Sequence, residues 1–154
     1  MPHIHEKIDY TVEVFIVFQN KVLLRRHDKY GIWLSVGGHI ELNEDPNEAA
    51  LREVKEEVGL DIRLDNSLLP PTKATDTAQD LIPPFFLGRH RINETHEHIT
   101  FIYFATSNTD HLNLSTTEKS ADVHWFNKEK LENTADIIPD VRFYALQALS
   151  KLSS

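Results

Sequence analysis

The segment from residue 38 to residue 60, GHIELNEDPNEAALREVKEEVGL, constrains the fold more than any other part of the chain. It predicts a helix from Pro46 to Val58, because proline is favoured at the first helical position and Asp45 is a good N-cap. Gly59 is a good C-terminal stop, since glycine readily adopts the left-handed conformation found there. Most residues in between are strong helix formers. A helix with defined ends is therefore expected here.

This helix is predicted to carry an apolar face beside an acidic face. At ~100° per residue, the apolar arc holds Ala50, Leu51, Val54 and Val58, and the neighbouring arc holds Glu53, Glu56 and Glu57. Like charges at these spacings repel each other by a few tenths of a kcal/mol per pair. The cluster is either a solvated acidic surface or a site for a hard divalent cation, which prefers oxygen ligands.

The same segment also contains a complete motif, G-x5-E-x7-R-E-U-x-E-E-x-G-U, where U is an aliphatic residue. Its nine specified positions are filled by Gly38, Glu44, Arg52, Glu53, Val54, Glu56, Glu57, Gly59 and Leu60. In this motif the chain resembles the Nudix hydrolases. One departure lies just before it, because Val36 stands where many relatives have proline. This departure removes no catalytic group.

The resemblance implies a metal-dependent pyrophosphohydrolase that cleaves a nucleoside diphosphate linked to another moiety, such as an NTP or a modified nucleotide. Water attacks phosphorus in this reaction, and a divalent ion neutralises the diphosphate and activates the water. The implied ion is Mg²⁺, with Mn²⁺ as a substitute. Its implied direct ligands are Glu53 and Glu57, with Glu56 bound directly or through water and the carbonyl of Gly38 completing the site. A nucleotide-sensing Nudix domain without catalysis is the alternative.

Arg52 is expected to orient the carboxylates. Its guanidinium fork can hold carboxylates by paired hydrogen bonds, and the resemblance gives Arg52 and Glu44 such a supporting role among the catalytic residues. From the helical spacing alone, Arg52 pairs either with Glu48, one turn earlier, or with Glu44 before the helix. Substrate-binding candidates are Arg26 and the paired glycines Gly37 and Gly38.

The general base is left open between the helix glutamates and two glutamates in the segment NETHEH. These two are Glu97, our catalytic candidate outside the helix, and Glu94. Glu97 lies between His96 and His98, so the three side chains either face the metal or the substrate phosphates or simply end a loop. A His-x-His pair also suits zinc, but the sequence shows no third ligand.

Composition limits the class of protein. With 154 residues, the chain is expected to form a single Nudix hydrolase domain over residues 1–154, as a monomer or homodimer. A formal charge of −8 disfavours duplex nucleic acid as a partner and leaves a small-molecule nucleotide diphosphate. Cysteine is absent, which excludes disulfides and the catalytic cysteine of the related isopentenyl-diphosphate isomerases. The apolar run VFIVF is too short to span a bilayer, so a cytoplasmic protein without membrane contact is expected.

The remaining pattern predicts strands on both sides of the acidic helix and a second helix at the C-terminus. The predicted strands are residues 11–18 and 21–27, joined by a tight turn at Gln19-Asn20, then 33–36, 60–64, 98–106 and 121–126. Residues 65–97 read mostly as loop, with a strand near 85–87. An amphipathic helix is expected over 139–152. Residues 128–131 are similar to the short helix that follows the late strand in the Nudix family. The expected fold class is α/β, the Nudix α/β/α sandwich with a mixed β-sheet between helices.

Overall fold

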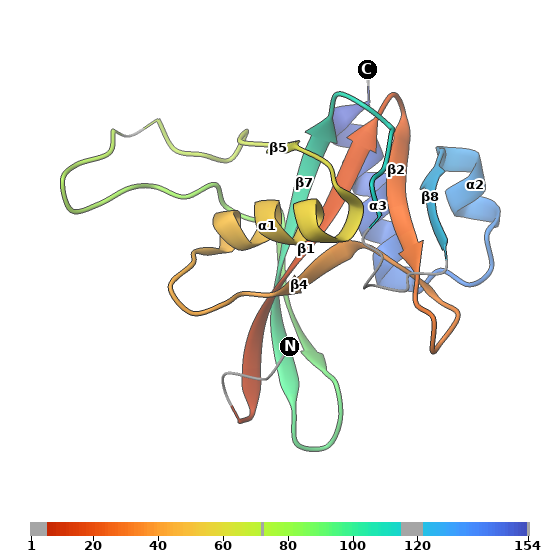
Figure 1. Cartoon of the computed structure of the whole chain (residues 1–154), viewed down its shortest axis with the longest axis horizontal. Helices are drawn as coiled ribbons and strands as arrows, with labels where there is room; N and C mark the ends of the chain where they lie inside the picture. Colours follow the sequence, from red (N-terminus) through yellow and green to blue (C-terminus); the bar gives the residue numbers. More distant parts are fainter. Residues whose placement is uncertain (1–5, 72, 115–121, 154) are drawn as a thin grey trace.

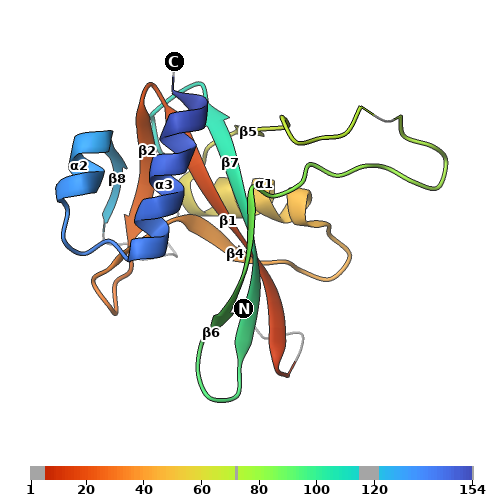
Figure 2. The same ribbon diagram turned by 180° about the vertical axis from the view of Figure 1, so that it is seen from behind.

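The computed structural model describes residues 6–71, 73–114 and 122–153. In chain order the elements are β1 (Ile8–Phe18), β2 (Lys21–Arg26), β3 (Trp33–Leu34), β4 (Val36–His39), α1 (Pro46–Val58), β5 (Ile62–Leu64), β6 (Phe86–Arg91), β7 (Glu97–Ser107), β8 (Asp122–Phe126), α2 (Lys128–Asn133) and α3 (Pro139–Leu152). Figures 1 and 2 show α1 on one side of the sheet and α3 on the other. The predicted α/β/α arrangement is confirmed.

The sheet is mixed, as predicted, and is organised around two long strands. β1 and β7 run parallel over ten paired positions, from Ile8 opposite Glu97 to Val17 opposite Thr106. The other pairings are antiparallel, with β2 and β4 on β1, β5 and β6 on β7, and β3 and β8 on β2. Because β1 is central, side chains from several other strands meet those of β1 on both faces of the sheet.

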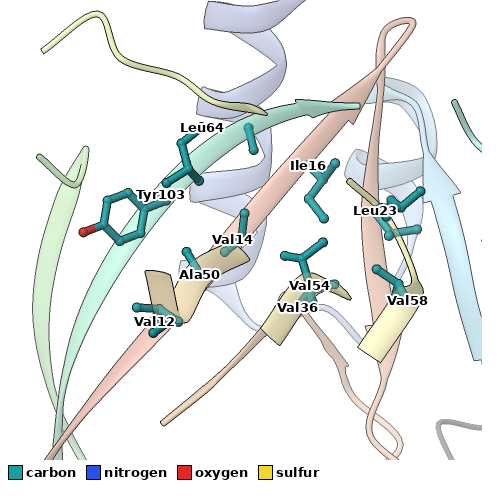
Figure 3. Close-up of a cluster of buried hydrophobic side chains, with 13 residues drawn as sticks. Val12, Val14, Ile16, Leu23, Val36, Ala50, Val54, Val58, Leu64 and Tyr103 are labelled. Carbon is teal, nitrogen blue, oxygen red and sulfur yellow. The ribbon is translucent and has the colours of Figure 1, made fainter. Parts of the chain in front are cut away.

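Alternation along β1 divides the core into two layers. Val12, Val14 and Ile16 pack with α1, in the cluster drawn in Figure 3. Phe15 and Val17 point to the opposite face and pack with the residues of α3. Successive side chains of a strand point to opposite faces, so one apolar strand supplies both layers. The amphipathic C-terminal helix is confirmed, with Val141, Ala145, Ala148 and Leu149 buried.

The predicted hairpin between β1 and β2 is also confirmed. Gln19 and Asn20 have φ angles of 44° and 64°, the left-handed values that a tight two-residue hairpin turn requires. The prediction of one strand over residues 33–36 was less accurate, since two short strands, β3 and β4, meet at Ser35. Gly37 and Gly38 lie inside β4 and not in a flexible connection.

The segment between β5 and β6 is mostly loop, as predicted, and extends away from the sheet beside α1 (Figure 1). Near its end, this segment is attached to α1 through Ile82 and Asn47. The Asn47 side chain accepts a hydrogen bond from the Ile82 nitrogen at 2.8 Å and donates one to the Ile82 carbonyl at 3.0 Å. The predicted strand near 85–87 is present as β6.

Within the described residues, no helix is long and apolar enough to cross a membrane.

Candidate active site

Helix α1 has the ends that the sequence predicted. The Asp45 side chain accepts from the Glu48 nitrogen at 2.8 Å, and the Glu48 side chain accepts from the Asp45 nitrogen at 3.0 Å. This reciprocal capping box satisfies two otherwise unpaired donors of the first turn. Gly59 ends the helix in the left-handed conformation, with φ 71°. Glu48 is therefore used as a cap, which removes it as the partner of Arg52.

The buried face of α1 differs from the predicted one at its edges. Leu51 was placed on the apolar face but is 44% exposed. Glu53 and Glu57 are instead almost fully buried, at 8% and 6% exposed, while the Glu56 side chain is 56% exposed. The face of α1 that meets the sheet therefore includes Glu53 and Glu57 and excludes Leu51. Two carboxylates are consequently held against the protein and a third meets solvent.

Arg52 connects the acidic residues of the helix to the loop before it. Its Nε and Nη2 donate to the two oxygens of Glu44 at 3.0 and 2.6 Å, and Nη2 also donates to the His39 carbonyl at 2.9 Å. Its Nη1 donates to Glu53 at 3.0 Å and to Glu56 at 3.2 Å. The hydrogen bonds from Arg52 lower the pKa of Glu44, and the carboxylates of Glu44 and Glu53 raise the pKa of Arg52. Glu44 and Arg52 therefore form a charged pair at neutral pH.

Gly38 forms a close contact with the helix. A Cβ at Gly38 would overlap the carboxylate of Glu53, and one at Gly37 would overlap the carbonyl of Val12 on β1. Neither glycine has a positive φ. These two positions therefore need glycine for space and not for an unusual backbone conformation. The absence of side chains brings β4 against the acidic face of α1.

Strand β2 supplies a cation to the same face. Arg25 Nε lies 3.3 Å from Glu57 Oε2. Arg26, the candidate named from the sequence, donates instead to the Gly31 carbonyl at 3.0 Å and does not line the cavity described below. Adjacent residues of a strand face opposite ways, so only one of the two arginines can meet α1. The two arginines are adjacent in the sequence, which does not show which of them faces α1.

A cavity of about 380 Å³ lies between the sheet and the first turns of α3. Its polar lining includes Glu13, Arg25, His39, His98, Asp140 and Tyr144, and its wall includes Gly37 and Gly38. This volume lies within the range of small-molecule pockets, roughly 300–1,000 Å³. Burial raises the pKa of Glu13, while nearby His90 and the Ser35 hydroxyl act in the opposite direction. The two glycines therefore separate a small-molecule cavity from the carboxylates of α1.

Glu97 and Glu94 are not brought to the helix glutamates. Val12 on β1 pairs with Gly38 on one side and with Phe101 of β7 on the other. Glu97 is the first residue of β7 and lies four residues before Phe101. At about 3.3 Å per residue, Glu97 is roughly 13 Å along the strand from the level of Gly38. Its two oxygens accept from Arg89 at 2.5 and 3.1 Å, and this pairing lowers the pKa of Glu97. Glu94 is exposed in the turn between β6 and β7.

The donor set on α1 and β4 fits a hard divalent ion. Two buried carboxylates, Glu53 and Glu57, share one helix face, and Gly38 leaves no side chain between its backbone and Glu53. Oxygen-rich groups of this kind are the ligands that Mg²⁺ and Mn²⁺ prefer. Arg52 and Arg25 contact Glu53 and Glu57 and balance negative charge there. Gly38, Glu53 and Glu57 are therefore the residues that would hold a metal directly, and Glu56 is the exposed carboxylate beside them.

Several polar residues of the cavity were missed at the level of sequence. Strand β1 reads IDYTVEVFIVF, in which Asp9, Thr11 and Glu13 alternate with other residues before an apolar run. All three point to the face opposite the buried Val12, where Thr11 Oγ1 meets Thr100 Oγ1 at 2.8 Å. Polar residues at every second position of a largely buried strand are the signal that could have identified this face.

Comparison with known proteins agrees with the geometry. A family model described as NUDIX domain matches residues 8–147. A solved structure described as a hydrolase of the NUDIX family from Clostridium perfringens superposes with a TM-score of 0.83 at 35% identity, covering 94% of this chain and 98% of that one. A MutT NUDIX hydrolase from Burkholderia pseudomallei, at 17% identity and a TM-score of 0.66, supports the fold alone.

Two curated relatives match shorter segments. The chain is 36% identical over 86 residues to the dihydroneopterin triphosphate diphosphatase of Haemophilus influenzae, covering 55% of this chain and 53% of the relative. It is 38% identical over 61 residues to the RNA pyrophosphohydrolase of Gluconacetobacter diazotrophicus, covering 40% and 36%. The chain thus matches about half the length or less of these relatives. The motif is intact, the family model covers most of the chain, and the solved NUDIX hydrolase from Clostridium perfringens is 35% identical. The chain therefore belongs to the Nudix hydrolase family.

Proposed function

We propose that the chain is a metal-dependent pyrophosphohydrolase that cleaves a nucleoside diphosphate linked to another moiety by attack of water on phosphorus. The observation that carries this proposal is the pair of buried carboxylates, Glu53 and Glu57, on the face of α1 that meets Gly38. Burying two like charges is costly unless a cation accompanies them. Arg52 and Arg25 provide compensation from the protein, and a divalent ion held by the two carboxylates would add to it.

Each residue of the site has a role that follows from its position. Glu53 and Glu57 would hold Mg²⁺ or Mn²⁺ with the carbonyl of Gly38, and the bound ion would neutralise phosphate charge and lower the pKa of water. Arg52, fixed by Glu44, keeps the Glu53 and Glu56 carboxylates in one orientation. Glu56 is the helix carboxylate exposed to solvent. We assign to Glu56 the acceptance of the proton of the attacking water.

The helix is favoured over β7 as the source of the general base. A general base must come within hydrogen-bond reach of the proton it removes, about 2.6–3.2 Å, or act through one water. Glu97 starts β7 roughly 13 Å along the strand from the level of Gly38 and is held by Arg89. The Glu53 carboxylate lies at Gly38 itself, and Glu56 accepts from the same Arg52 nitrogen as Glu53. Glu56 therefore replaces Glu97 as our candidate.

The substrate is proposed as a nucleoside triphosphate, a modified nucleotide or a related compound with a terminal diphosphate. The names of the two curated relatives point to triphosphate or pyrophosphate groups on different molecules, a pterin derivative and RNA. The cavity of about 380 Å³ on the α3 side is large enough for a base or pterin ring but not for a folded RNA. Gly37 and Gly38 line that cavity, and Gly38 also lies against the Glu53 carboxylate of α1.

A hydrolysis screen tests the proposal. The panel contains NTPs, oxidised dNTPs, dihydroneopterin triphosphate, ADP-ribose, nucleotide sugars, dinucleoside polyphosphates and 5′-triphosphorylated RNA, each with Mg²⁺ and with Mn²⁺. We expect cleavage within the diphosphate of at least one triphosphate, and no cleavage by a Glu53→Gln/Glu57→Gln double variant prepared in parallel. Tight nucleotide binding without turnover on any compound would favour a sensing domain instead.

A further inference from the structure

A second polar cluster lies on the α3 face of the sheet, separate from the carboxylates of α1. Its members are Asp9, His39, His96 and His98. Strand pairing brings them together, because Asp9 on β1 lies opposite His98 on β7, and His39 on β4 lies opposite Thr11, two residues after Asp9. Residues two apart on a strand share a face. Three strands and the turn before β7 therefore contribute to one cluster.

The cluster has the separation of atoms that a metal site requires. Asp9, His39 and His98 each present one potential ligand atom, and these three atoms all lie within 4.8 Å of one another. His39 Nε2 is 3.6 Å from Asp9 Oδ2. The His39 and His98 rings meet edge to face with their centroids 5.0 Å apart. Small shifts of these side chains suffice to place three ligands about 2.0–2.2 Å from one zinc ion.

A further histidine contacts the same oxygen of Asp9 that His39 approaches. His96 Nε2 lies 3.1 Å from Asp9 Oδ2, and both side chains are almost fully buried, at 7% and 2% exposed. Carboxylates that bind metals are commonly oriented by an outer hydrogen-bond partner of this kind. A carboxylate at this depth is also costly without a nearby cation. The burial and the outer contact both favour a positive charge beside Asp9.

We propose that Asp9, His39 and His98 form a second metal site that binds one divalent transition ion, with Zn²⁺ the preferred ion and His96 a positioning residue for Asp9. Two imidazoles and one carboxylate suit zinc and its transition-metal neighbours, whereas Mg²⁺ prefers an all-oxygen set. This donor set also differs from the all-oxygen set on α1, so the two sites select different ions.

The site would act on ligands of the cavity. His39 and His98 line the cavity, whereas Asp9 and His96 do not. Three protein ligands leave an open position on a tetrahedral zinc ion, as in zinc sites that bind a water or a substrate atom. The ion would add positive charge to a cavity whose lining includes the acidic residues Glu13 and Asp140. It would thereby bind an oxygen or ring nitrogen of the group attached to the diphosphate.

The test is a Zn²⁺ titration of the full chain after removal of metals with chelator, carried out in excess Mg²⁺ so that the carboxylates of α1 are already engaged. We expect one equivalent of Zn²⁺ to bind, and Co²⁺ to give a visible absorption spectrum in its place. The same equivalent should bind in the Glu53→Gln/Glu57→Gln double variant. Zn²⁺ should also raise the melting temperature, because it binds the folded state only.

Single substitutions assign the ligands. His98→Gln and His39→Gln should each weaken Zn²⁺ binding by more than about 100-fold, whereas His96→Gln should weaken it by about 10–100-fold, as expected for an outer partner. The matched control is His90→Gln, since His90 pairs with His98 across β6 and β7 and also lines the cavity but is not part of the cluster. It should retain the Zn²⁺ equivalent and its thermal shift.

Two results would overturn the site. One is a parent protein that binds no Zn²⁺ equivalent in excess Mg²⁺, which would leave the cluster as a group of histidines packed around Asp9. The other is undiminished binding in both His98→Gln and His39→Gln. Melting temperatures without metal are recorded for each variant. If His98→Gln is unfolded, His39→Gln decides the question, because the His39 side chain is partly exposed and its loss disturbs less packing.

Discussion

The two faces of the sheet carry polar groups that are organised in different ways. On the α1 face, Glu44, Arg52, Glu53 and Glu56 come from one short stretch of chain and are joined by hydrogen bonds to a single guanidinium. On the α3 face, the lining of the cavity is assembled from β1, β4, β6, β7 and α3. One face is therefore built by local sequence and the other by strand pairing.

This difference suggests that the two faces of the sheet have different functions. The carboxylates of α1 are positioned by a capped helix and by Gly38, so that their geometry depends on few long-range contacts. The cavity can change its lining through substitutions on several strands while the helix stays the same. We expect substitutions on the α1 face to alter the rate of the chemical step, and substitutions on the α3 face to alter stability or the choice of ligand.

The largest predicted effect is that of Glu57→Gln on the α1 face. Glutamine keeps the shape of the side chain but removes the charge that we assign to metal binding and that pairs with Arg25. We expect kcat to fall by at least about 100-fold, in line with the loss of a preorganised charge at a reaction centre. Steady-state kinetics at saturating Mg²⁺ measures the effect.

Lys55→Gln is the matched control on the same helix. Lys55 is 58% exposed and contacts Asp61, so its loss should change kcat by less than about threefold. If Lys55→Gln abolished activity while Glu57→Gln retained it, the assignment of the active helix face would be wrong.

The next effect in size is that of Arg52→Ala. Arg52 contacts the reacting groups only through Glu44, Glu53 and Glu56, so its loss should cost about 10–100-fold in kcat with folding retained. Arg52→Lys should recover little of this loss, because an ammonium cannot reproduce the paired hydrogen bonds of the fork. Near-parental activity in both variants would mean that the fork has no role in orienting the carboxylates.

How far the sequence predicts the structure depends on the same contrast. The bounds and caps of α1 were predicted correctly because they depend on neighbours within the segment, such as Asp45, Glu48 and Gly59. Leu51 was assigned to the wrong face because a helical wheel does not show how the helix is rotated against the sheet. The exposure of Leu51 and the burial of Glu57 are set by the packing of α1 on β1 and β4.

The α3 face was hardly predictable from sequence. The pair His96 and His98 was visible, but no third ligand was evident, because Asp9 and His39 lie far from the pair in the sequence. Only the register of β1 with β7 and β4 brings them together. The sequence also could not show that Glu97 lies away from the carboxylates of α1, because the position of a residue at a loop end does not indicate which residues it faces.

A smaller effect, on stability, is predicted for Glu13→Gln on the α3 face. Burial raises the pKa of Glu13, so the folded state holds this proton more tightly than the unfolded state does. The free energy of unfolding therefore decreases as the pH rises from the ordinary carboxyl pKa through the raised one. Glutamine stays neutral, so the variant should melt higher than the parent at pH 7, by about 2–4 °C for each kcal/mol gained.

At pH 4 the two proteins should melt at nearly the same temperature, because Glu13 is then protonated in the folded parent as well. Thermal melts at the two pH values measure the difference. A variant that is less stable than the parent at pH 7 would show that the Glu13 carboxylate is stabilised by its neighbours rather than penalised by burial.

The smallest effect on rate is predicted for Glu97→Gln. Because Glu97 is bound to Arg89 and lies away from the level of Gly38, the substitution should change kcat by less than about threefold, well below the 10²–10⁴-fold of a general base. Glu94→Gln serves as the neighbouring control. A fall of 100-fold or more in Glu97→Gln alone would return the role of general base to β7.

The measurement that tests the account most directly is the metal dependence of hydrolysis by the parent protein. The carboxylates of α1 are proposed to work through a hard divalent ion, and Glu53 and Glu57 are proposed as its ligands. We predict that turnover of the best substrate disappears in EDTA and returns on addition of Mg²⁺ or Mn²⁺ in excess of the chelator. Undiminished turnover in chelator would contradict the proposed mechanism.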